Sequence, residues 1–467
     1  MDKLDLKKIT EYLHKNLSKD RFLHSISVAK TAKKITEIIG GLDPDKAYLT
    51  GLVHDCAREI GDEKLINFSK EHRIKVDHFT QKAPYLLHAA VGAKIAKKQF
   101  KIADNEILRA IEKHCVPKPH MDLLDKIIYL ADAEKEWAEN NKILTVEHKS
   151  LDQALLYTYD AHIQYFIDHG HRIHPDLIRS RNKMLENFSK KILILGSNGM
   201  LGKALAQEFK DCQLTAWDKK DLDITDRKKL QEKIFSLQPD IIINAAADTN
   251  VEKAEENQEK ILRVNGKAVG NLAQIAKKIN AIFIHYSTDY VFDGKSRKGY
   301  RETAQPNPIN VYGKSKFLGE ALLRSNCDKY YLIRSSWMFG PGGVNFVDKI
   351  LQKARINAKL DVVNDQWGKP TFAPDLAKAT KQILEQERPF GIYHLTNEGK
   401  TNWYQFSRQI LALSKSKARV NPVSSQNYPS PVKRPIHSAL LNTKLPKLRH
   451  WEEALGEYLR CRCEERP

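Results

Sequence analysis

Two patterns of apolar residues divide the sequence near residue 189. In the first part, apolar residues recur every three or four positions, which is the spacing of one face of an α-helix. This spacing is found in residues 4–17, 26–39, 47–53, 88–100, 107–114, 123–131 and 151–169, and a charged helical stretch follows Pro175. Since few β-branched runs interrupt these stretches, the pattern predicts an all-α helical bundle over residues 1–188.

Short apolar runs alternate with helical stretches after residue 190. The expected strands are residues 192–195, 213–217, 240–244, 281–286 and 330–333, and helical stretches such as 268–278 and 316–323 separate them. Strands that alternate with helices favour a doubly wound parallel sheet, so we expect an α/β domain of the Rossmann type over residues 190–467. The protein is therefore predicted to have two domains.

Composition narrows the class of protein. A chain of 467 residues with 41% hydrophobic residues has enough apolar side chains for two cores. No apolar run reaches the ~18 residues that cross a bilayer, and the first residues lack the apolar core of a signal peptide. Six cysteines without a CxxC pair favour free thiols. We therefore expect a cytoplasmic protein with no membrane partner.

The net charge of +19 raises the question of a nucleic-acid partner. The lysines are spread through helical segments and form no long basic block, and neither zinc-finger spacing nor an RNA-binding aromatic signature is present. We expect no nucleic-acid partner, and instead a lysine-rich surface that favours phosphorylated small molecules.

The segment 191–202, KILILGSNGMLG, places three glycines between a predicted strand and a predicted helix. Glycines at such a turn let the backbone approach a pyrophosphate, and the helix N-terminus offers free N–H groups. Asp218 ends the next strand, where an acid meets the adenosine ribose of NAD, whereas Lys219 and Lys220 suit the 2′-phosphate of NADP. The choice between NADH and NADPH stays open. The expected cofactor-binding residues are Gly196, Asn198, Gly199, Met200, Leu201, Gly202, Asp218, Asp223, Ile224, Ala245, Ala246, Ala247, Tyr312 and Lys316.

Three further residues suggest proton transfer. Thr288 stands at the end of a predicted strand, and Tyr312 and Lys316 are four residues apart on a predicted helix. Residues four apart share one helix face, so we expect the Lys316 ammonium beside the Tyr312 phenol. A neighbouring cation lowers the pKa of a phenol from about 10, which makes proton transfer feasible near neutral pH. Thr288, Tyr312 and Lys316 are the expected catalytic residues.

Together with the glycine turn, these residues are similar to those of the extended short-chain dehydrogenase/reductases. The segments GSNGMLG, INAAADTNVEKAE, YSTDYVFDG, RSSWMFG and NDQWGKPTFAPDLA resemble the dTDP-4-dehydrorhamnose reductases. The resemblance implies reduction of the 4-keto group of dTDP-6-deoxy-L-lyxo-4-hexulose to give dTDP-L-rhamnose, in a fold with a smaller C-terminal substrate subdomain. It also implies that Tyr312 donates the proton and Thr288 hydrogen-bonds the developing alkoxide. The implied contacts with the sugar nucleotide are Asp289, Trp337, Asn345 and Arg434.

This resemblance leaves several alternatives open. Relatives of these reductases serve as regulatory subunits of methionine adenosyltransferase, so a non-catalytic, cofactor-binding role is the alternative function. A Mg²⁺ ion at the reductase and a homodimer are both compatible with the resemblance. Trp337 has core packing as a rival role, and Asp248 and Asn250 depart from the residues usual in their loop.

Acids and imidazoles interrupt the apolar stripes of the predicted bundle at several positions. They are His24, His54 with Asp55, His88, His114 and Asp132. Burying one such side chain costs several kcal/mol unless it is paired or bound to a metal, so a shared metal centre accounts for all of them. Imidazole and carboxylate ligands suit iron, manganese or zinc, which the sequence does not separate.

These positions, within the segments LTGLVHDCARE, HAAVGA, IEKH and DKIIYLADAE, resemble the HD-domain phosphohydrolases and most closely the bacterial symmetrical diadenosine tetraphosphatases. The resemblance implies a divalent metal centre that splits a dinucleoside tetraphosphate into two ADP molecules. It assigns His24, His54, Asp55 and Asp132 to one metal and His88 and His114 to a second, with Asp55 as the bridge. Arg58 is the expected phosphate-binding residue, followed by Lys118 and His120. A nucleotide sensor without turnover is the alternative.

Overall fold

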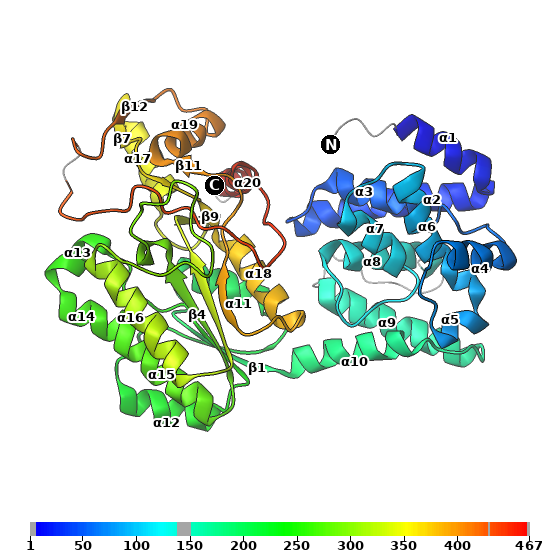
Figure 1. The fold of residues 1–467 in the computed structure, drawn as a ribbon, viewed down its shortest axis with the longest axis horizontal. Helices are drawn as coiled ribbons and strands as arrows, with labels where there is room; N and C mark the ends of the chain where they lie inside the picture. Colours follow the sequence, from blue (N-terminus) through cyan, green and yellow to red (C-terminus); the bar gives the residue numbers. More distant parts are fainter. Residues whose placement is uncertain (1–5, 138–150, 428–429, 465–467) are drawn as a thin grey trace. The chain divides into compact units, whose positions relative to one another are not determined.

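The computed structural model divides the chain into two units, residues 1–188 and residues 189–467 (Figure 1). It describes residues 6–137, 151–427 and 430–464. Each unit has its own hydrophobic core. Among the described residues, no helix combines the length and the apolar composition needed to traverse a bilayer.

Helices make up the regular structure described in the first unit. They are α1 (Leu6–Asn16), α2 (Lys19–Ile39), α3 (Pro44–Val53), α4 (Asp62–Glu71), α5 (His78–Lys82), the 3₁₀ helix η1 (Pro84–Leu86), α6 (Leu87–Lys98), α7 (Asn105–Lys113), α8 (Leu123–Trp137), α9 (Leu151–Asp168) and α10 (Pro175–Ser189). The all-α prediction is confirmed. The sequence pattern missed α4 and α5, because α5 has only five residues and Leu65 is the one fully buried apolar residue of α4.

Polar caps fix where the helices that carry the functional residues begin. The carboxylate of Asp43 accepts a hydrogen bond from the backbone N–H of Asp45 at the start of α3. The carboxylate of Asp104 likewise accepts from the N–H groups of Glu106 and Ile107 at the start of α7. Such caps satisfy N–H groups that have no partner within the helix. The caps fix where α3 and α7 begin. His54 and His114 are the residues that directly follow these two helices.

The first unit is held together around α2 and α8. α2 packs against both α3 and α8, and α7 packs against α6 and α8. Gly51 makes the closest of these approaches possible, since a Cβ atom there would lie 2.8 Å from the Cα atom of Ala29 on α2. The ends of α3 and α7 therefore meet α2, α6 and α8 in the interior of the bundle.

The second unit contains a six-stranded parallel sheet. Its strands are β1 (Lys191–Leu195), β2 (Gln213–Trp217), β3 (Ile241–Asn244), β4 (Ile282–Thr288), β5 (Tyr330–Ser335) and β10 (Gly391–His394), in the spatial order β10-β5-β4-β3-β1-β2. All paired strands in this sheet are parallel. The chain reverses its direction of winding between β1 and β3, and ligands bind at such a switch point, beyond the carboxyl ends of the strands.

Helices cover both faces of this sheet (Figure 1). Ile192 and Ile194 of β1 share a core with α11 (Met200–Glu208) and α18 (Ala373–Glu385). Leu193 and Leu195 share the opposite core with α12 (Arg227–Leu237), α15 (Ala268–Lys278) and α16 (Val311–Asn326). Because successive side chains of a strand point to opposite faces, a strand covered on both sides is apolar throughout. The predicted doubly wound α/β fold is confirmed.

A smaller subdomain follows the sheet. It contains three two-stranded sheets, which pair β6 (Met338–Phe339) with β9 (Thr371–Phe372), β7 (Lys359–Val363) with β12 (Arg419–Val423), and β8 (Trp367–Gly368) with β11 (Thr401–Asn402). Its helices α17 (Phe346–Ile356), α19 (Trp403–Leu413) and α20 (Trp451–Glu464) enclose an aromatic-rich core.

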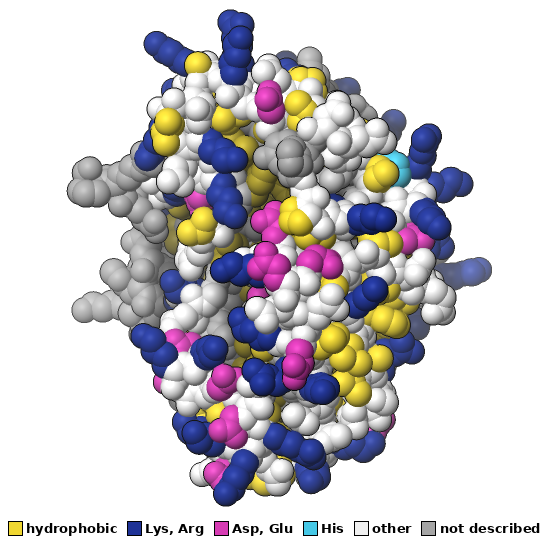
Figure 2. All heavy atoms as spheres, turned by 90° about the vertical axis from the view of Figure 1, so that its left-hand side faces the viewer, with side chains coloured by type: hydrophobic (Ala, Val, Ile, Leu, Met, Phe, Trp, Pro, Cys, Tyr) yellow, Lys and Arg dark blue, Asp and Glu magenta, His cyan; other side chains and the backbone are white. Residues whose placement is uncertain are grey.

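On the face shown in Figure 2, Lys and Arg side chains are spread over the whole surface and interspersed with Asp and Glu.

A buried ion pair ties α16 to the sheet. The guanidinium of Arg334 on β5 donates two hydrogen bonds to Glu320 on α16, at 2.9 and 2.6 Å, and both side chains are 1% exposed. The hydroxyl of Ser287 on β4 donates a third bond to the same carboxylate. A buried charge left without its partner destabilises a fold strongly, so this pair fixes the position of α16.

We predict that Arg334→Met destabilises the second unit by about 3–5 kcal/mol, because it leaves Glu320 buried without a counter-charge. Urea unfolding of the full chain, followed by a probe in the α/β unit, measures this loss. Lys277→Met is the matched control, because it breaks an ion pair with Asp328 that is exposed on both sides, at 57% and 81%. That change should cost less than about 1 kcal/mol. Equal losses in the two variants would contradict the assignment.

Candidate functional site

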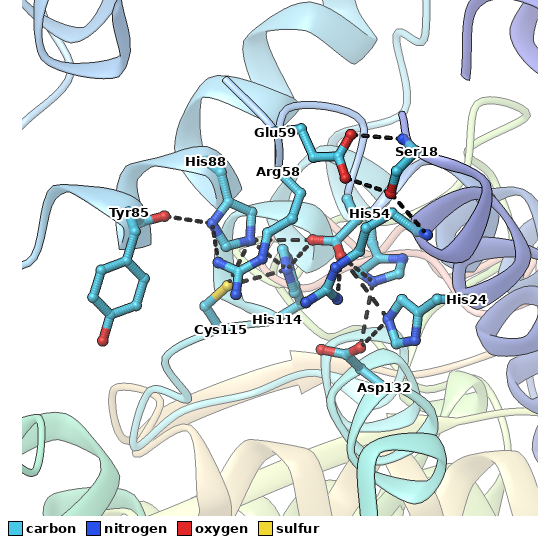
Figure 3. A network of polar contacts seen from close by, with 12 residues as sticks. Ser18, His24, His54, Arg58, Glu59, Tyr85, His88, His114, Cys115 and Asp132 are labelled. Atoms are coloured by element: carbon cyan, nitrogen blue, oxygen red, sulfur yellow. Dashed lines mark hydrogen bonds and ion pairs between the residues drawn. The ribbon is translucent and has the colours of Figure 1, made fainter. Parts of the chain in front are cut away.

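The helical bundle gathers its polar residues into one buried cluster (Figure 3). His24 lies on α2, His54 and Asp55 follow α3, His88 lies on α6, His114 follows α7, and Asp132 lies on α8. The structure therefore brings together six residues that are spread over more than a hundred positions of the sequence. His54, His88 and His114 are at most 3% exposed.

Backbone carbonyls fix the orientation of three of the imidazoles. The Nδ1 atoms of His54 and His114 each lie 2.7 Å from the carbonyl oxygen three residues earlier, on Gly51 and Ile111. His88 Nδ1 lies 2.5 Å from the carbonyl of Tyr85. Since a carbonyl only accepts hydrogen bonds, each Nδ1 carries a proton, and each Nε2 lone pair points into the cluster. A hydrogen bond from one ring nitrogen to a backbone carbonyl is typical of histidines that bind a metal through the other nitrogen.

His54 supplies a direct test of whether a metal ion fits. Its Nε2 atom is completely buried and meets no hydrogen-bond geometry among the described residues, and the nearest acceptors are the carboxylate oxygens of Asp132 and Asp55, at 3.4 and 3.6 Å. A buried polar atom without a partner costs about 1–3 kcal/mol, so a native structure rarely leaves one unmatched. A cation bound to Nε2 would satisfy it, and the imidazole and carboxylate donors around it suit a divalent transition metal.

The Asp55 carboxylate lies between two groups of histidines. Its Oδ1 atom is 3.1 Å from His88 Nε2 and 3.4 Å from His114 Nε2. Its Oδ2 atom is 3.6 Å from His54 Nε2 and 3.9 Å from His24 Nε2. Asp132 Oδ1 completes the second group, 2.9 Å from His24 Nε2 and 3.4 Å from His54 Nε2. Asp55 thus contacts both ligand groups expected from the sequence, and His54, Asp55 and His114 also lie within 4.8 Å of one another across the two groups.

The charges of the cluster shift the pKa values of its members. Burial would raise the pKa of the Asp55 carboxyl, but the neighbouring imidazoles, first among them His54, hold it well below its usual range. Burial would lower the pKa of His114, but Cys115 and Asp55 raise it well above 6.5. The Nε2 positions therefore attract positive charge, which is the electrostatic property that a cation site needs.

Cys115 belongs to this cluster, although the sequence analysis did not select it. Its Sγ atom lies 3.0 Å from His88 Nε2 and 3.1 Å from His114 Nε2. Burial would raise the pKa of the thiol, but these two imidazoles lower it to about 6. The only signal in the sequence was its position directly after His114, which by itself identifies no ligand.

The cluster opens into a cavity of 1590 Å³ within the first unit. Its basic and aromatic lining includes Arg21, Arg58, Lys82, Lys118, Arg172, Arg179, Phe79, Tyr85, Tyr157, Tyr165 and Phe166. The guanidinium of Arg58 lies 3.2 Å from His88 Nδ1 and faces the ring of Tyr85. Lys118 lines the cavity but also forms an ion pair with Asp176 at 2.6 Å, and exposed His120 is not among the lining residues.

In the second unit, the glycine turn lies at the switch point of the sheet. Gly196 has a φ of +79°, and a Cβ atom there would lie 2.6 Å from the backbone nitrogen of Ala246. A Cβ atom on Gly202 would overlap the carbonyl oxygen of Gly196. Gly199 is the N-cap residue of α11, whose first residues are Met200 and Leu201. Ala245–Ala247 follow β3 directly beside this turn.

The other expected cofactor-binding residues surround the end of β2. Asp218 follows β2 and accepts hydrogen bonds from the backbone N–H of Lys220 and from the side chain of Asn198. Asp223 accepts from the backbone N–H of Thr225 at 2.9 Å, and Ile224 is buried. Asn198 thus connects the glycine turn to the acid expected at the adenosine ribose.

The expected catalytic residues meet at the end of β4. Thr288 ends β4, while Tyr312 and Lys316 lie in the first turns of α16, which packs against β4. Thr288 lies close enough to Tyr312 to lower the pKa of the phenol. The ammonium of Lys316 donates to the carbonyl of Tyr286 at 2.6 Å and lies 3.5 Å from His285 Nε2.

The expected lowering of the Tyr312 pKa by the Lys316 ammonium is wrong for this structure. Burial raises the pKa of the Tyr312 phenol, the Asp289 charge raises it further, and the neighbouring Thr288 hydroxyl offsets only part of the increase. Burial also lowers the pKa of Lys316 to about 8. The Lys316 ammonium does not stabilise the phenolate here, because the Tyr286 carbonyl holds it.

The four residues expected to contact the sugar nucleotide differ in their surroundings. Buried Asp289 accepts hydrogen bonds from Ser438 and Thr288, and burial raises its pKa to about 7. Half-buried Trp337 stacks on Trp403, with ring centroids 3.5 Å apart. Arg434 forms an ion pair with Glu252 at 3.1 Å.

Asn345 has a structural role that the sequence prediction did not include. Its side-chain oxygen caps α17 by accepting from the N–H of Asp348, and its nitrogen donates to the Gly340 carbonyl and the Tyr458 hydroxyl, each at 3.0 Å. Since both ends of the amide are used within the protein and the residue is 5% exposed, it has no group free for a sugar nucleotide.

Comparisons with known proteins agree with this division into two sites. Residues 190–462 match the RmlD substrate binding domain, and residues 21–135 match the HD domain. The spore coat polysaccharide biosynthesis protein SpsK of Bacillus subtilis is 38% identical over 275 residues, which are 58% of this chain and 96% of that protein. A dTDP-4-dehydrorhamnose reductase of Aggregatibacter actinomycetemcomitans is 38% identical over 284 residues, 57% of this chain and 97% of that protein.

A solved structure extends the comparison to the fold. The crystal structure of dTDP-4-dehydrorhamnose reductase from Bacillus anthracis, in complex with NADP, has 33% sequence identity and a TM-score of 0.57. The match covers 58% of this chain and 99% of that chain. The two resemblances expected from the sequence, to these reductases and to the HD-domain proteins, are thereby confirmed.

We predict that Gly202→Ala destabilises the second unit by about 1–3 kcal/mol or more and weakens cofactor binding, because its Cβ atom would push the turn away from α11. Thermal unfolding and fluorescence titration with NADPH measure the two effects. Gly199→Ala is the matched control for stability alone, because Gly199 is itself an expected cofactor-binding residue and its Cβ atom would meet only the Gly196 carbonyl oxygen, at 3.3 Å. If the two variants behaved alike, close packing of the turn would not be the constraint.

Proposed function

The chain belongs to the RmlD substrate binding domain family, and on this premise we propose that its second unit reduces a dTDP-4-keto-6-deoxy sugar with NADPH or NADH, giving dTDP-L-rhamnose from dTDP-6-deoxy-L-lyxo-4-hexulose. The arrangement of Thr288, Tyr312 and Lys316 at the carboxyl edge of the sheet supports this proposal most directly. The NADP in the Bacillus anthracis relative supports a nicotinamide cofactor.

Tyr312 is the proposed proton donor. A nicotinamide, when bound, would supply a hydride to C4 of the sugar, and Tyr312 would give its phenolic proton to the carbonyl oxygen. Because burial raises the pKa of this phenol, it stays protonated at neutral pH until negative charge develops on the substrate. Thr288 then exchanges its bond to Asp289 for a hydrogen bond to that oxygen. Lys316 positions the cofactor ribose beside them.

For the first unit, we propose hydrolysis of a dinucleoside tetraphosphate into two ADP molecules. Bound metal ions activate water and stabilise the phosphoryl oxygens. His24, His54, Asp132 and Asp55 would hold one ion, and His88 and His114, with the other oxygen of Asp55, the second. The cavity exceeds the roughly 300–1,000 Å³ of a typical small-ligand pocket, which suits a substrate with two nucleosides. Arg58 and Arg21 face it as phosphate-binding groups.

We predict that Tyr312→Phe lowers keto-sugar reduction by about 10²–10⁴-fold and leaves hydrolysis of diadenosine tetraphosphate unchanged, because only the proton donor is lost. NAD(P)H oxidation and ADP release, measured on the same preparation, test this. Tyr331→Phe is the matched control, since its buried hydroxyl bonds only the Arg388 carbonyl on the far edge of the sheet. A wild-type protein that binds NADPH but leaves the keto-sugar unreduced would favour the regulatory alternative.

We predict that Asp55→Asn abolishes ADP release and lowers the amount of metal bound per chain, because it removes the negative charge that lies between both ligand groups. Elemental analysis and the ADP assay measure the loss, and keto-sugar reduction should persist. Asp125→Asn is the matched control, since Asp125 is equally buried but pairs with Lys113 and Arg109 outside the cluster. Metal bound to wild type without ADP release would instead support a nucleotide sensor.

A further inference from the structure

Cys115 occupies a position that the imidazole and carboxylate ligands leave open. It follows α7 directly, and its sulfur faces both imidazoles of one ligand group (Figure 3). The Nε2 atoms of His88 and His114 and the sulfur all lie within 4.8 Å of one another. The second group, formed by His24, His54 and Asp132, contains no sulfur.

The contacts around Cys115 join atoms that can all serve as metal ligands. His88 Nε2 and His114 Nε2 are 3.2 Å apart, and both rings already use Nδ1–H on a backbone carbonyl. Asp55 Oδ1 lies 3.1 and 3.4 Å from the same two nitrogens. A single cation beside the two nitrogens and the sulfur would be bound by all three.

The spacing of these atoms matches ligands of one ion. A nitrogen and a sulfur at about 2.1 and 2.3 Å from a transition metal lie about 3.1 Å apart at right angles and about 3.6 Å apart in tetrahedral geometry. The two nitrogen–sulfur distances here are 3.0 and 3.1 Å, and the nitrogen–oxygen distances are 3.1 and 3.4 Å. The two nitrogens and the sulfur thus have the spacing of three ligands of one ion, and Asp55 Oδ1 lies beside both nitrogens.

We propose that Cys115 is a thiolate ligand of the metal held by His88, His114 and Asp55, which makes this subsite selective for zinc, cobalt or ferrous iron over manganese and magnesium. The inference rests on the proposed metal centre of the first unit. Soft sulfur ligands favour these thiophilic metals, whereas the nitrogen and oxygen ligands around His24 and His54 do not discriminate in this way. The two subsites therefore differ in the metal they prefer.

Cobalt substitution gives a readout that does not depend on activity. Metal-depleted full-length protein is titrated with Co²⁺, and a thiolate-to-cobalt charge-transfer band should rise in the near ultraviolet. Cys115→Ser should lose the band and bind zinc at least about tenfold more weakly, while keeping metal at the other subsite. Cys56→Ser is the matched control and should keep the band, because the Cys56 thiol is directed at the Gly92 carbonyl.

Alkylation of the wild-type protein is a second test, which does not require the Cys115→Ser variant to fold. Cys115 lines the cavity, so iodoacetamide should label it in metal-depleted protein, and zinc should protect it. Exposed Cys461 is the internal control and should be labelled in both states. A wild type that binds metal without the charge-transfer band and without protection of Cys115 would overturn the thiolate ligand alone. A wild type that binds no metal would overturn the proposed centre itself.

Discussion

Both units depend on the same constraint, which is that a buried polar or charged side chain must find a partner. In the bundle, the histidines and acids between the helices find their partners in one another, in Cys115, in Arg21 and in backbone carbonyls, because the surrounding core is apolar. The carbonyls of Gly51, Tyr85 and Ile111 take up one nitrogen of each of three rings and thereby direct the other nitrogen inwards. The helix ends thus decide the chemistry of the cluster as well as its position.

In the α/β unit, the same constraint positions a single helix. Glu320 anchors α16 to Arg334 and Ser287, and Lys316 on the same helix is held by the Tyr286 carbonyl. Glycines let this helix approach its neighbours, since a Cβ atom on Gly313 would overlap the Tyr290 carbonyl. Tyr312, one turn before Lys316, is therefore held against Thr288 by groups that take no part in the chemistry.

The charge state of Tyr312 bears on its role in proton transfer. A phenol with a lowered pKa serves as a base, whereas a buried phenol with a raised pKa keeps its proton and serves as an acid. The surroundings of Tyr312, with Asp289 nearby and the Lys316 ammonium held elsewhere, suit proton donation. That is the role required for reduction of a ketone.

The sequence by itself determined the class of each unit and selected most of the residues that the structure brings together. Helical spacing before residue 189 and short apolar runs after it indicate local burial, and the glycines at 196 and 202 stand where a Cβ atom would overlap neighbouring backbone. Only the tertiary structure decided what these side chains touch. In the tertiary structure, Cys115 contacts two imidazoles, the Asn345 amide caps a helix, and the Lys316 ammonium donates a hydrogen bond to a backbone carbonyl. Hydrogen bonds and charge interactions act over a few ångströms between residues far apart in the chain, so they arise from packing and leave no periodic trace in the sequence.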